Sequence, residues 1–215
     1  MDSILFVVVE IVIAIIVISI VFYYGYFLRQ PKRSVPYHNR VFVSPASGKV
    51  ISIISTEQEH IDIYKDNEKA LELFTDWLCG PFTIVSIMMT PMDVHYQRAP
   101  YDSIILDQAH YPGKFYNAVR KSKTLKSTFR NENNQMLFET DTGIRYKVIQ
   151  IAGLLARRIV SYIKPWQEVQ QGDVIGLIKF GSQVTIVFDN QVDVIARIGQ
   201  KVVDGETVLA LTKQE

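Results

Sequence analysis

The sequence predicts a mainly β protein, carried by one N-terminal transmembrane helix and containing at least one short amphipathic helix. Three features support this prediction: an apolar run over residues 4–28, an apolar stripe at helical spacing within residues 66–78, and short β-rich segments through most of the remaining chain. We therefore expect a transmembrane anchor at residues 1–28, a basic juxtamembrane linker at 29–40 and one domain at 41–215.

The apolar run is longer than the roughly 20 residues that cross a bilayer. Glu10 is its one charged residue, and we expect its side chain to reach toward the membrane interface, with a contact inside the membrane as the alternative. Only Asp2 precedes the run as a charge, so the basic start of a cleaved signal peptide is lacking. An aromatic belt and several basic residues follow: Tyr23, Tyr24, Tyr26, Arg29, Lys32, Arg33 and Arg40. The positive-inside rule then predicts a single-pass protein of the cell membrane with its domain in the cytosol.

Short β-rich runs bounded by turn residues predict strands at 41–43, 50–54 and 84–88. Residues 66–78 differ, because Asp66 is a good N-cap and the apolar residues that follow recur at helical spacing. The simplest function of this stripe is core packing. A helix lying on lipid headgroups is the alternative.

The C-terminal part contains a repeat, in which residues 164–177 align with residues 197–210. Gly172 falls on Gly205, and each unit is predicted to be a strand, a glycine turn and a second strand. Two such hairpins stacked face to face form a flattened β-sandwich or barrel, as in biotinyl and lipoyl carriers. Those carriers modify a lysine at a hairpin tip, whereas the polar residue between these two units is Ser182.

Charge and cysteine content exclude several classes of function. With 23 basic and 22 acidic residues the net charge is +1, which gives no electrostatic case for nucleic-acid binding. The single cysteine, Cys79, excludes an intrachain disulfide framework and a multi-cysteine metal site. We therefore expect no bound metal.

Gly181 and Ser182 interrupt an apolar, β-branched run at residues 175–188. Glycine weakens a strand interior and commonly marks a bulge or a close approach of two backbones. A serine held there could attack the carbonyl of Gly181, convert the amide to an ester and, after elimination and hydrolysis, leave a pyruvoyl group. The dipeptide alone is a weak signal and favours an ordinary β-bulge.

Several blocks around this dipeptide resemble the phosphatidylserine decarboxylase family in its short-chain form, which includes archaetidylserine decarboxylase-like proteins. The blocks occur in the family's order and cover most of residues 41–211, but not 55–82. They are VSPASGKVISI at 43–53, TPMDVHYQRAP at 90–100, YPGKFYNA at 111–118, and the long stretches 126–188 and 193–210.

This resemblance implies a pyruvoyl enzyme with the family's β fold. Self-cleavage between Gly181 and Ser182 would give a β chain of residues 1–181 and an α chain of 182–215 headed by the pyruvoyl cofactor. The amine of phosphatidylserine or archaetidylserine would form a Schiff base with it, lose carbon dioxide and leave as the ethanolamine phospholipid. The partners would be the membrane phospholipid and the chain's own two fragments, with a homo-oligomer left open.

The resemblance also assigns proton transfer to His95, which lies in the block that matches the family's histidine motif. The family carries aspartate where this chain has Ser47, and that aspartate orients the catalytic histidine. A hydroxyl can orient an imidazole but cannot stabilise an imidazolium by charge. Asp93, two residues before His95, is a second candidate for this support.

The phosphate and carboxylate of the headgroup need cationic partners. Candidates in or beside the resembling blocks are Arg157, Arg158, Arg98 and Lys114. The alternative for each is a solvated surface charge or a contact with the bilayer.

Two classes of function remain open from the sequence. The first is a membrane-anchored decarboxylase that matures at Ser182. The second is a decarboxylase-like protein that never matures and serves as a membrane binding or adaptor module.

Overall fold

The computed structural model describes residues 2–36, 40–55, 81–113, 131–153, 158–179 and 182–213. The amphipathic helix expected at residues 66–78 lies outside this part of the chain.

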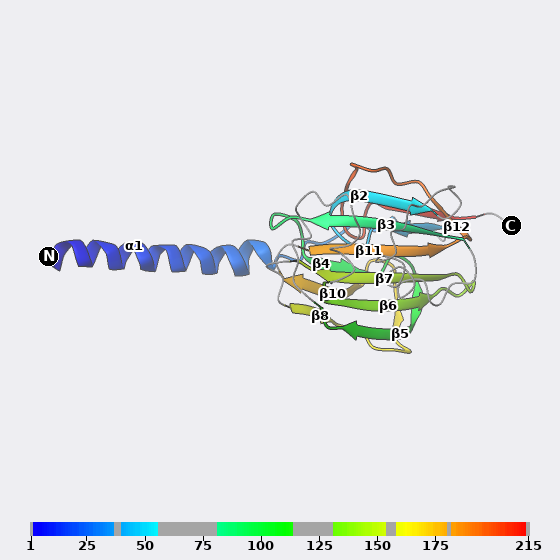
Figure 1. The fold of residues 1–215 in the computed structure, drawn as a ribbon, viewed down its shortest axis with the longest axis horizontal. Coiled ribbons are helices and arrows are strands. Elements are labelled where there is room, and N and C mark those ends of the chain that lie inside the picture. Colours follow the sequence, from blue (N-terminus) through cyan, green and yellow to red (C-terminus); the bar gives the residue numbers. More distant parts are fainter. Residues whose placement is uncertain are drawn as a thin grey trace.

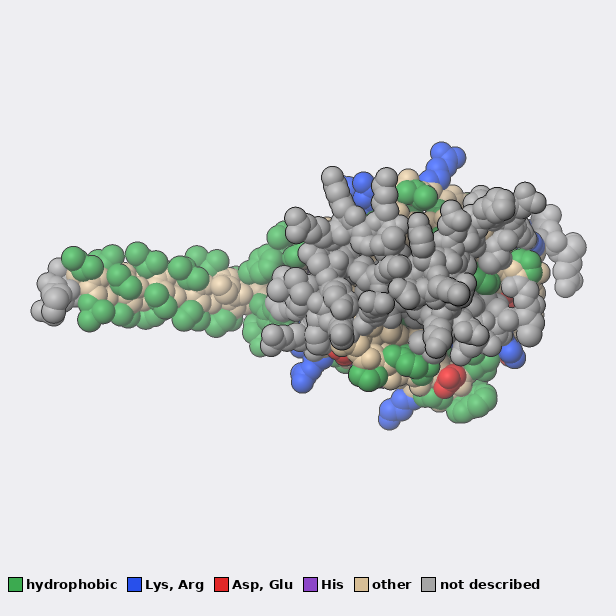
Figure 2. Space-filling view, viewed as in Figure 1, with side chains coloured by type: hydrophobic (Ala, Val, Ile, Leu, Met, Phe, Trp, Pro, Cys, Tyr) green, Lys and Arg blue, Asp and Glu red, His purple; other side chains and the backbone are tan. Residues whose placement is uncertain are grey.

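The N-terminal apolar segment is a single helix that projects from a β domain and is called the anchor helix below (Figure 1). It consists of the α-helix α1 (Asp2–Val21) and a π-helical turn η1 (Phe22–Phe27). Residues Ile4–Phe27 are long and apolar enough to cross a membrane, as expected from the sequence. Hydrophobic side chains cover the helix along its length and gather where it meets the domain (Figure 2), which is typical of a helix surrounded by lipid.

The described part of the domain is built from antiparallel strands in three sheets. The largest sheet has the order β13 (Lys201–Val202), β2 (Gly48–Ser55), β3 (Phe82–Met89), β11 (Ser182–Asp189), β7 (Arg145–Ala152), β6 (Asn133–Glu139), β5 (Ser103–Tyr111) and β9 (Glu168–Val169). One small sheet has the order β1 (Val41–Val43), β14 (Val208–Thr212) and β12 (Val192–Val194). The other small sheet has the order β4 (Tyr96–Arg98), β10 (Val174–Lys179) and β8 (Arg158–Ser161). The fold is therefore mainly β, as predicted, and the strands expected at 41–43, 50–54 and 84–88 are confirmed as β1, β2 and β3.

The main core lies between the large sheet and the two small ones. Along β11, alternate residues Val184, Ile186 and Phe188 enter this core, whereas Val187 belongs to a smaller cluster. At the centre, Phe42 of β1 contacts three other aromatic rings at 4.6–5.3 Å between centroids, those of Tyr101, Tyr146 and Phe188. The core therefore connects strands from both ends of the chain.

The sequence repeat is present, but its units form corners rather than hairpins. In the first unit β9 pairs with β5 while β10 pairs with β4 and β8. In the second, β13 pairs with β2 while β14 pairs with β1 and β12. The glycine turns have the left-handed backbone expected for glycine, with φ of 89° at Gly172 and 72° at Gly205. Each turn passes the chain from the large sheet to a small one, a choice that depends on tertiary pairing.

Replacing Phe42 by alanine should lower the free energy of unfolding by about 3–5 kcal/mol, because the change empties a fully buried aromatic site. Denaturant unfolding in detergent micelles, followed by circular dichroism, measures this loss. Trp166→Phe is the control, because that ring is 73% exposed, and it should change stability by less than about 0.5 kcal/mol. Equal losses in both variants would contradict this description of the core.

Candidate active site

Ser182 begins β11, the strand between β3 and β7. Its register partners are Met89 on β3 and Ala152 on β7, the last residues of those two strands. The ends of β3 and β7 and the start of β11 lie at the side of the sheet nearest the anchor helix (Figure 1). Phe180, Gly181 and the side chain of Ser182 lie outside the described residues.

The apolar run at residues 175–188 is two strands, not one interrupted strand. β10 ends at Lys179 in a small sheet, and β11 begins at Ser182 in the large sheet. The Gly-Ser dipeptide therefore lies where the chain crosses from one sheet to the other, and not inside a single strand.

His95 lies at the same end of the sheet as Ser182. Its carbonyl accepts hydrogen bonds from the backbone amide of Ile178 on β10, at 3.2 Å, and from Nε2 of Gln97, at 2.7 Å. The Gln97 amide also contacts Sδ of Met89, the register partner of Ser182, at 3.8 Å. The backbone of His95 is therefore connected to the strands on both sides of the dipeptide.

The tautomer of His95 follows from its contacts. Nδ1 is 2.9 Å from the backbone carbonyl of Asp93, and because a carbonyl can only accept, Nδ1 carries the proton in the neutral ring. Nε2 then holds a lone pair. This nitrogen is buried and has no hydrogen-bond partner among the described residues. An orphaned, buried acceptor is a good candidate for a general base.

Burial lowers the pKa of His95 from 6.5 to about 4, because the charged imidazolium loses its hydration. The hydrogen bond to the Asp93 carbonyl and the Asp93 charge act in the opposite direction, and the nearby Arg29 charge lowers the pKa further. His95 is therefore neutral at pH 7, in the state that accepts a proton.

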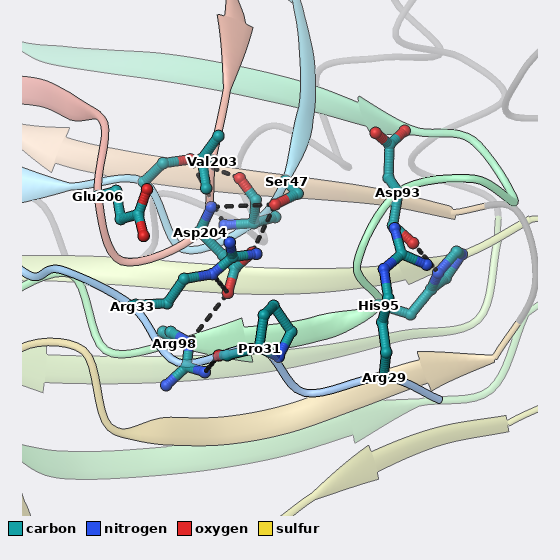
Figure 3. A network of polar contacts seen from close by, with 12 residues as sticks. Arg29, Pro31, Arg33, Ser47, Asp93, His95, Arg98, Val203, Asp204 and Glu206 are labelled. Carbon is teal, nitrogen blue, oxygen red and sulfur yellow. Dashed lines mark hydrogen bonds and ion pairs between the residues drawn. The ribbon is translucent and has the colours of Figure 1, made fainter. Parts of the chain in front are cut away.

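Asp93 supports His95 through its backbone rather than through its carboxylate. The carboxylate accepts hydrogen bonds from the amide and hydroxyl of Thr90, both at 2.7 Å, and the Asp93 amide donates to the Thr90 carbonyl. These bonds close the turn that aims the Asp93 carbonyl at the imidazole (Figure 3). The sequence suggested a compensating carboxylate, whereas the described contact is a compensating carbonyl.

Ser47 belongs to a different polar group. Its hydroxyl donates to the carboxylate of Asp204 at 2.5 Å and accepts from the Asp204 amide at 3.1 Å. Figure 3 shows this cluster apart from His95. The expected hydrogen bond from Ser47 to His95 is thus replaced by one to Asp204, because that fully buried carboxylate requires donors.

The cations expected to bind the headgroup are dispersed. Arg98 is buried and donates to Asp204, to the Gly172 carbonyl and to the Pro31 carbonyl. Its guanidinium therefore makes contacts inside the domain instead of facing a ligand site. Arg158 is exposed at the start of β8, directly opposite Lys179 at the end of β10. Arg157 and Lys114 lie outside the described residues.

A chain of buried amides leads from the His95 carbonyl into the domain. Gln97 accepts from Gln150 at 2.8 Å, and Gln150 accepts from Asn134 at 2.8 Å. Gln97 and Gln150 are fully buried and Asn134 is 2% exposed, so the network fixes the backbone that carries His95. Sequence inspection missed these residues, although polar residues at buried strand positions are a usable signal for such networks.

A cavity of about 580 Å³ lies elsewhere, lined by residues that include Asp102, Glu139, Asp141 and Glu168. Glu139 pairs with Arg145 at the start of β7, the opposite end of that strand from Ala152. The carboxylates that line the cavity would repel an anionic headgroup, so this cavity does not suit a phospholipid with such a headgroup.

The lowered pKa of His95 predicts a pH-dependent stability. Because the pKa of His95 is lower in the folded state than in the unfolded state, the unfolded chain binds more protons between pH 6.5 and 4. The free energy of unfolding therefore decreases as the pH is lowered from 6.5 to 4. The total loss should be about 3 kcal/mol. Denaturant unfolding at stepwise pH values should show this loss in the parent and not in His95→Asn, which cannot become charged. Equal slopes in both proteins would contradict the assignment.

Comparison with known proteins identifies the family of this chain. The family model for phosphatidylserine decarboxylase matches residues 9–210. The chain is 34% identical over 200 residues to the phosphatidylserine decarboxylase proenzyme of Geotalea uraniireducens, covering 93% of this chain and 84% of the relative. It is also 34% identical over 198 residues to a protein of Methanothermobacter thermautotrophicus assigned as an archaetidylserine decarboxylase proenzyme, covering 92% and 84%. The chain therefore belongs to the phosphatidylserine decarboxylase family of carboxy-lyases.

Proposed function

We propose that this protein is a membrane-anchored, pyruvoyl-dependent decarboxylase that converts phosphatidylserine or archaetidylserine to the ethanolamine phospholipid. It would mature by self-cleavage between Gly181 and Ser182 into chains 1–181 and 182–215. The observation that carries this proposal is Nε2 of His95, which has no hydrogen-bond partner among the described residues and is buried at the end of the sheet where Ser182 begins β11.

In maturation, His95 is the base. Nε2 takes the proton of the Ser182 hydroxyl as the oxygen attacks the Gly181 carbonyl, and the Asp93 carbonyl holds the ring through Nδ1. The family's aspartate would also stabilise the charged ring, and here that help is small because burial dominates the His95 pKa. Orientation is therefore retained, while charge stabilisation is weak.

The pyruvoyl group supplies a carbonyl that withdraws electrons from the carbon losing carbon dioxide. The site fits such a group, because a buried nitrogen with a free lone pair faces no other described partner. Because His95 is neutral at pH 7, the proton that it would return to that carbon is one that Nε2 first takes from the ammonium group of the substrate. The low pKa makes the protonated ring a strong acid, suited to this transfer.

The headgroup anions would be bound by Arg158 and Lys179. The two residues are direct register partners on antiparallel strands, so their side chains share a face, and like charges in that position repel each other. A bound phosphate or carboxylate would remove this repulsion. Lys179 is three residues before Ser182, which places both cations near the reacting end.

The anchor would hold the site against the inner leaflet of the cell membrane. The first 28 residues would be the span, residues 29–40 the juxtamembrane segment and residues 41–215 the cytosolic domain. The ends of β3 and β7 nearest the anchor helix support this arrangement, because a lipid headgroup there needs no transfer through water (Figure 1). Membership in an enzyme family favours the decarboxylase over the adaptor.

Ser182→Ala should abolish maturation. Intact-mass measurement of purified parent protein should give the two fragments, with hydroxylamine trapping a carbonyl on the smaller one, and Ser182→Ala should give one chain. His95→Asn should slow cleavage at least about 100-fold, because it keeps a donor for the Asp93 carbonyl but has no base. Ser161→Ala, a serine of β8 bonded to Gln108, should cleave normally. An uncut parent would favour the adaptor.

Arg158→Gln and Lys179→Gln should each raise the KM for phosphatidylserine in mixed micelles by roughly threefold to tenfold, the effect of losing one partly exposed charge contact. Self-cleavage should be unchanged, because neither residue touches the His95 ring in the described contacts. Arg145→Gln, at the far end of β7, is the matched control and should leave KM as it is. The same rise in all three would indicate loss of general surface charge instead.

A further inference from the structure

We propose that residues 27–36, which we call the strap, complete the active site, and that Phe27 is a positioning residue that keeps the His95 imidazole dry and in place. This inference deepens the proposed function, because it rests on His95 acting as the base. It goes beyond a membrane tether, since it makes the end of the anchor part of the catalytic end of the domain.

The strap begins where the membrane helix ends, and Phe27 lies directly on His95. The two ring centroids are 4.1 Å apart, and both side chains are fully buried. The Tyr23 ring also stacks on the Phe27 ring within the π-helical turn, with 5.6 Å between their centroids. π-Turns are rare and concentrate at functional sites, and here the turn ends with Phe27 on His95.

Arg29 fastens the first part of the strap. Its guanidinium donates to the Met92 carbonyl at 2.5 Å and lies 3.9 Å from the centre of the Tyr26 ring. The Tyr26 hydroxyl donates to the same carbonyl at 3.3 Å. Met92 directly precedes Asp93, whose carbonyl sets the tautomer of His95. The strap therefore contacts the His95 ring directly through Phe27 and is also bonded, through Arg29, to the turn whose Asp93 carbonyl binds Nδ1.

Asp204 fastens the middle of the strap. Its carboxylate is fully buried and pairs with Arg33 of the strap and with Arg98 of β4 (Figure 3). Arg98 in turn donates to the Pro31 carbonyl at 3.1 Å. A buried carboxylate is stable only with such partners, and removing one leaves an uncompensated charge. A freely moving linker would not be bound in this way.

The glycine turn at Gly172 leaves room for the strap, and the turn at Gly205 leaves room for Arg98, which binds the strap. A Cβ at Gly172 would be 2.5 Å from Cγ2 of Val35, whereas a Cβ at Gly205 would be 2.9 Å from Cδ of Arg98 and 3.7 Å, an ordinary contact, from Cγ of Arg33. The amide of Ser34 donates to Glu206, next to Gly205, at 3.1 Å. The repeat thus has a use that the sequence did not reveal, which is to let the strap approach the domain closely.

The consequence for His95 is exclusion of water. Loss of hydration is the main cause of its lowered pKa, and Phe27 is the strap residue whose ring covers the imidazole. Among the described residues, the charged groups that act on His95 are Asp93 from its own turn and Arg29 from the strap. Removing the Phe27 ring changes none of these charges, so its effect reports hydration.

The test is histidine side-chain NMR on the full-length chain in detergent or nanodiscs, with Ser182→Ala in the background and His95→Asn to assign the signal. The parent should titrate near pH 4. Phe27→Ala should raise the pKa of His95 by about one unit or more, Phe27→Val by less, and Phe27→Leu by under about half a unit. Tyr24→Ala is the control, because that ring is 68% exposed one turn earlier, and it should leave the pKa unchanged.

An unchanged His95 pKa in Phe27→Ala and Phe27→Val would overturn the proposal. So would an equal shift in Tyr24→Ala, since that would indicate general loosening of the helix end. In the cleavable protein, Phe27→Ala should slow self-cleavage at least tenfold, because loss of the fixed ring position outweighs the gain in basicity of His95. It should also move the pH profile upward, while Phe27→Leu restores both. Because the NMR readout requires no cleavage, it stays interpretable if the protein proves not to mature.

Discussion

The pairing of β11 with both β3 and β7 is the constraint on which the rest of the structure depends. β11 is hydrogen-bonded along its length on both sides, so Ser182 at its first position has a backbone fixed by two ladders. The preceding strand, β10, belongs to another sheet, and the chain must cross between them just before Ser182. The described backbone of Ser182 is therefore held by pairing on both sides, directly after the change of sheet.

The same pairing explains how the protein would survive its own cleavage. The proposed α chain carries β11, β12, β13 and β14. β11 pairs with β3 and β7, β13 with β2 and β14 with β1 of the proposed β chain, while β12 pairs with β14. The core includes Phe188 and Leu209 from the first and Phe42 and Tyr146 from the second. Cutting one bond removes none of these contacts, so the two chains should remain one folded body with the new terminus held between β3 and β7.

Much of this could be predicted from local sequence. The anchor, β1, β2, β3 and the two glycine turns were predictable because apolar length, β-branched runs and glycine report local requirements. The pairing partners of β9, β10, β13 and β14 were not, because the same short strands could fold back as hairpins or turn a corner. Asp204 gave no signal of its own, since an acidic residue beside a glycine turn is normally exposed, and only the arrival of Arg33 and Arg98 makes its burial favourable.

The site itself divides in the same way. Resemblance to family blocks led to Ser182 and His95, but the support for His95 could not be predicted from residue types. Asp93 was considered for its carboxylate and contributes its carbonyl, and Ser47 was considered for His95 and contacts Asp204. Such support depends on backbone direction, and a main-chain carbonyl is present at every position, so no side-chain pattern marks it.

A carbonyl and a carboxylate differ in what they can do for an imidazole. Both accept from Nδ1 and so select the tautomer with a basic Nε2, but a carboxylate stabilises the charged ring more strongly because it carries a full negative charge. In this chain the carbonyl is combined with burial under Phe27, which disfavours the charged ring further. The result is a histidine that binds a proton weakly and gives it up readily. For maturation this costs rate, because the proton leaves the serine against an unfavourable equilibrium. For decarboxylation the balance reverses, since the step after loss of carbon dioxide needs a strong acid beside a carbanion. On this argument Ser47, at the position where the resemblance implies an aspartate, is compatible with the proposed enzyme, which would mature slowly and then turn over efficiently.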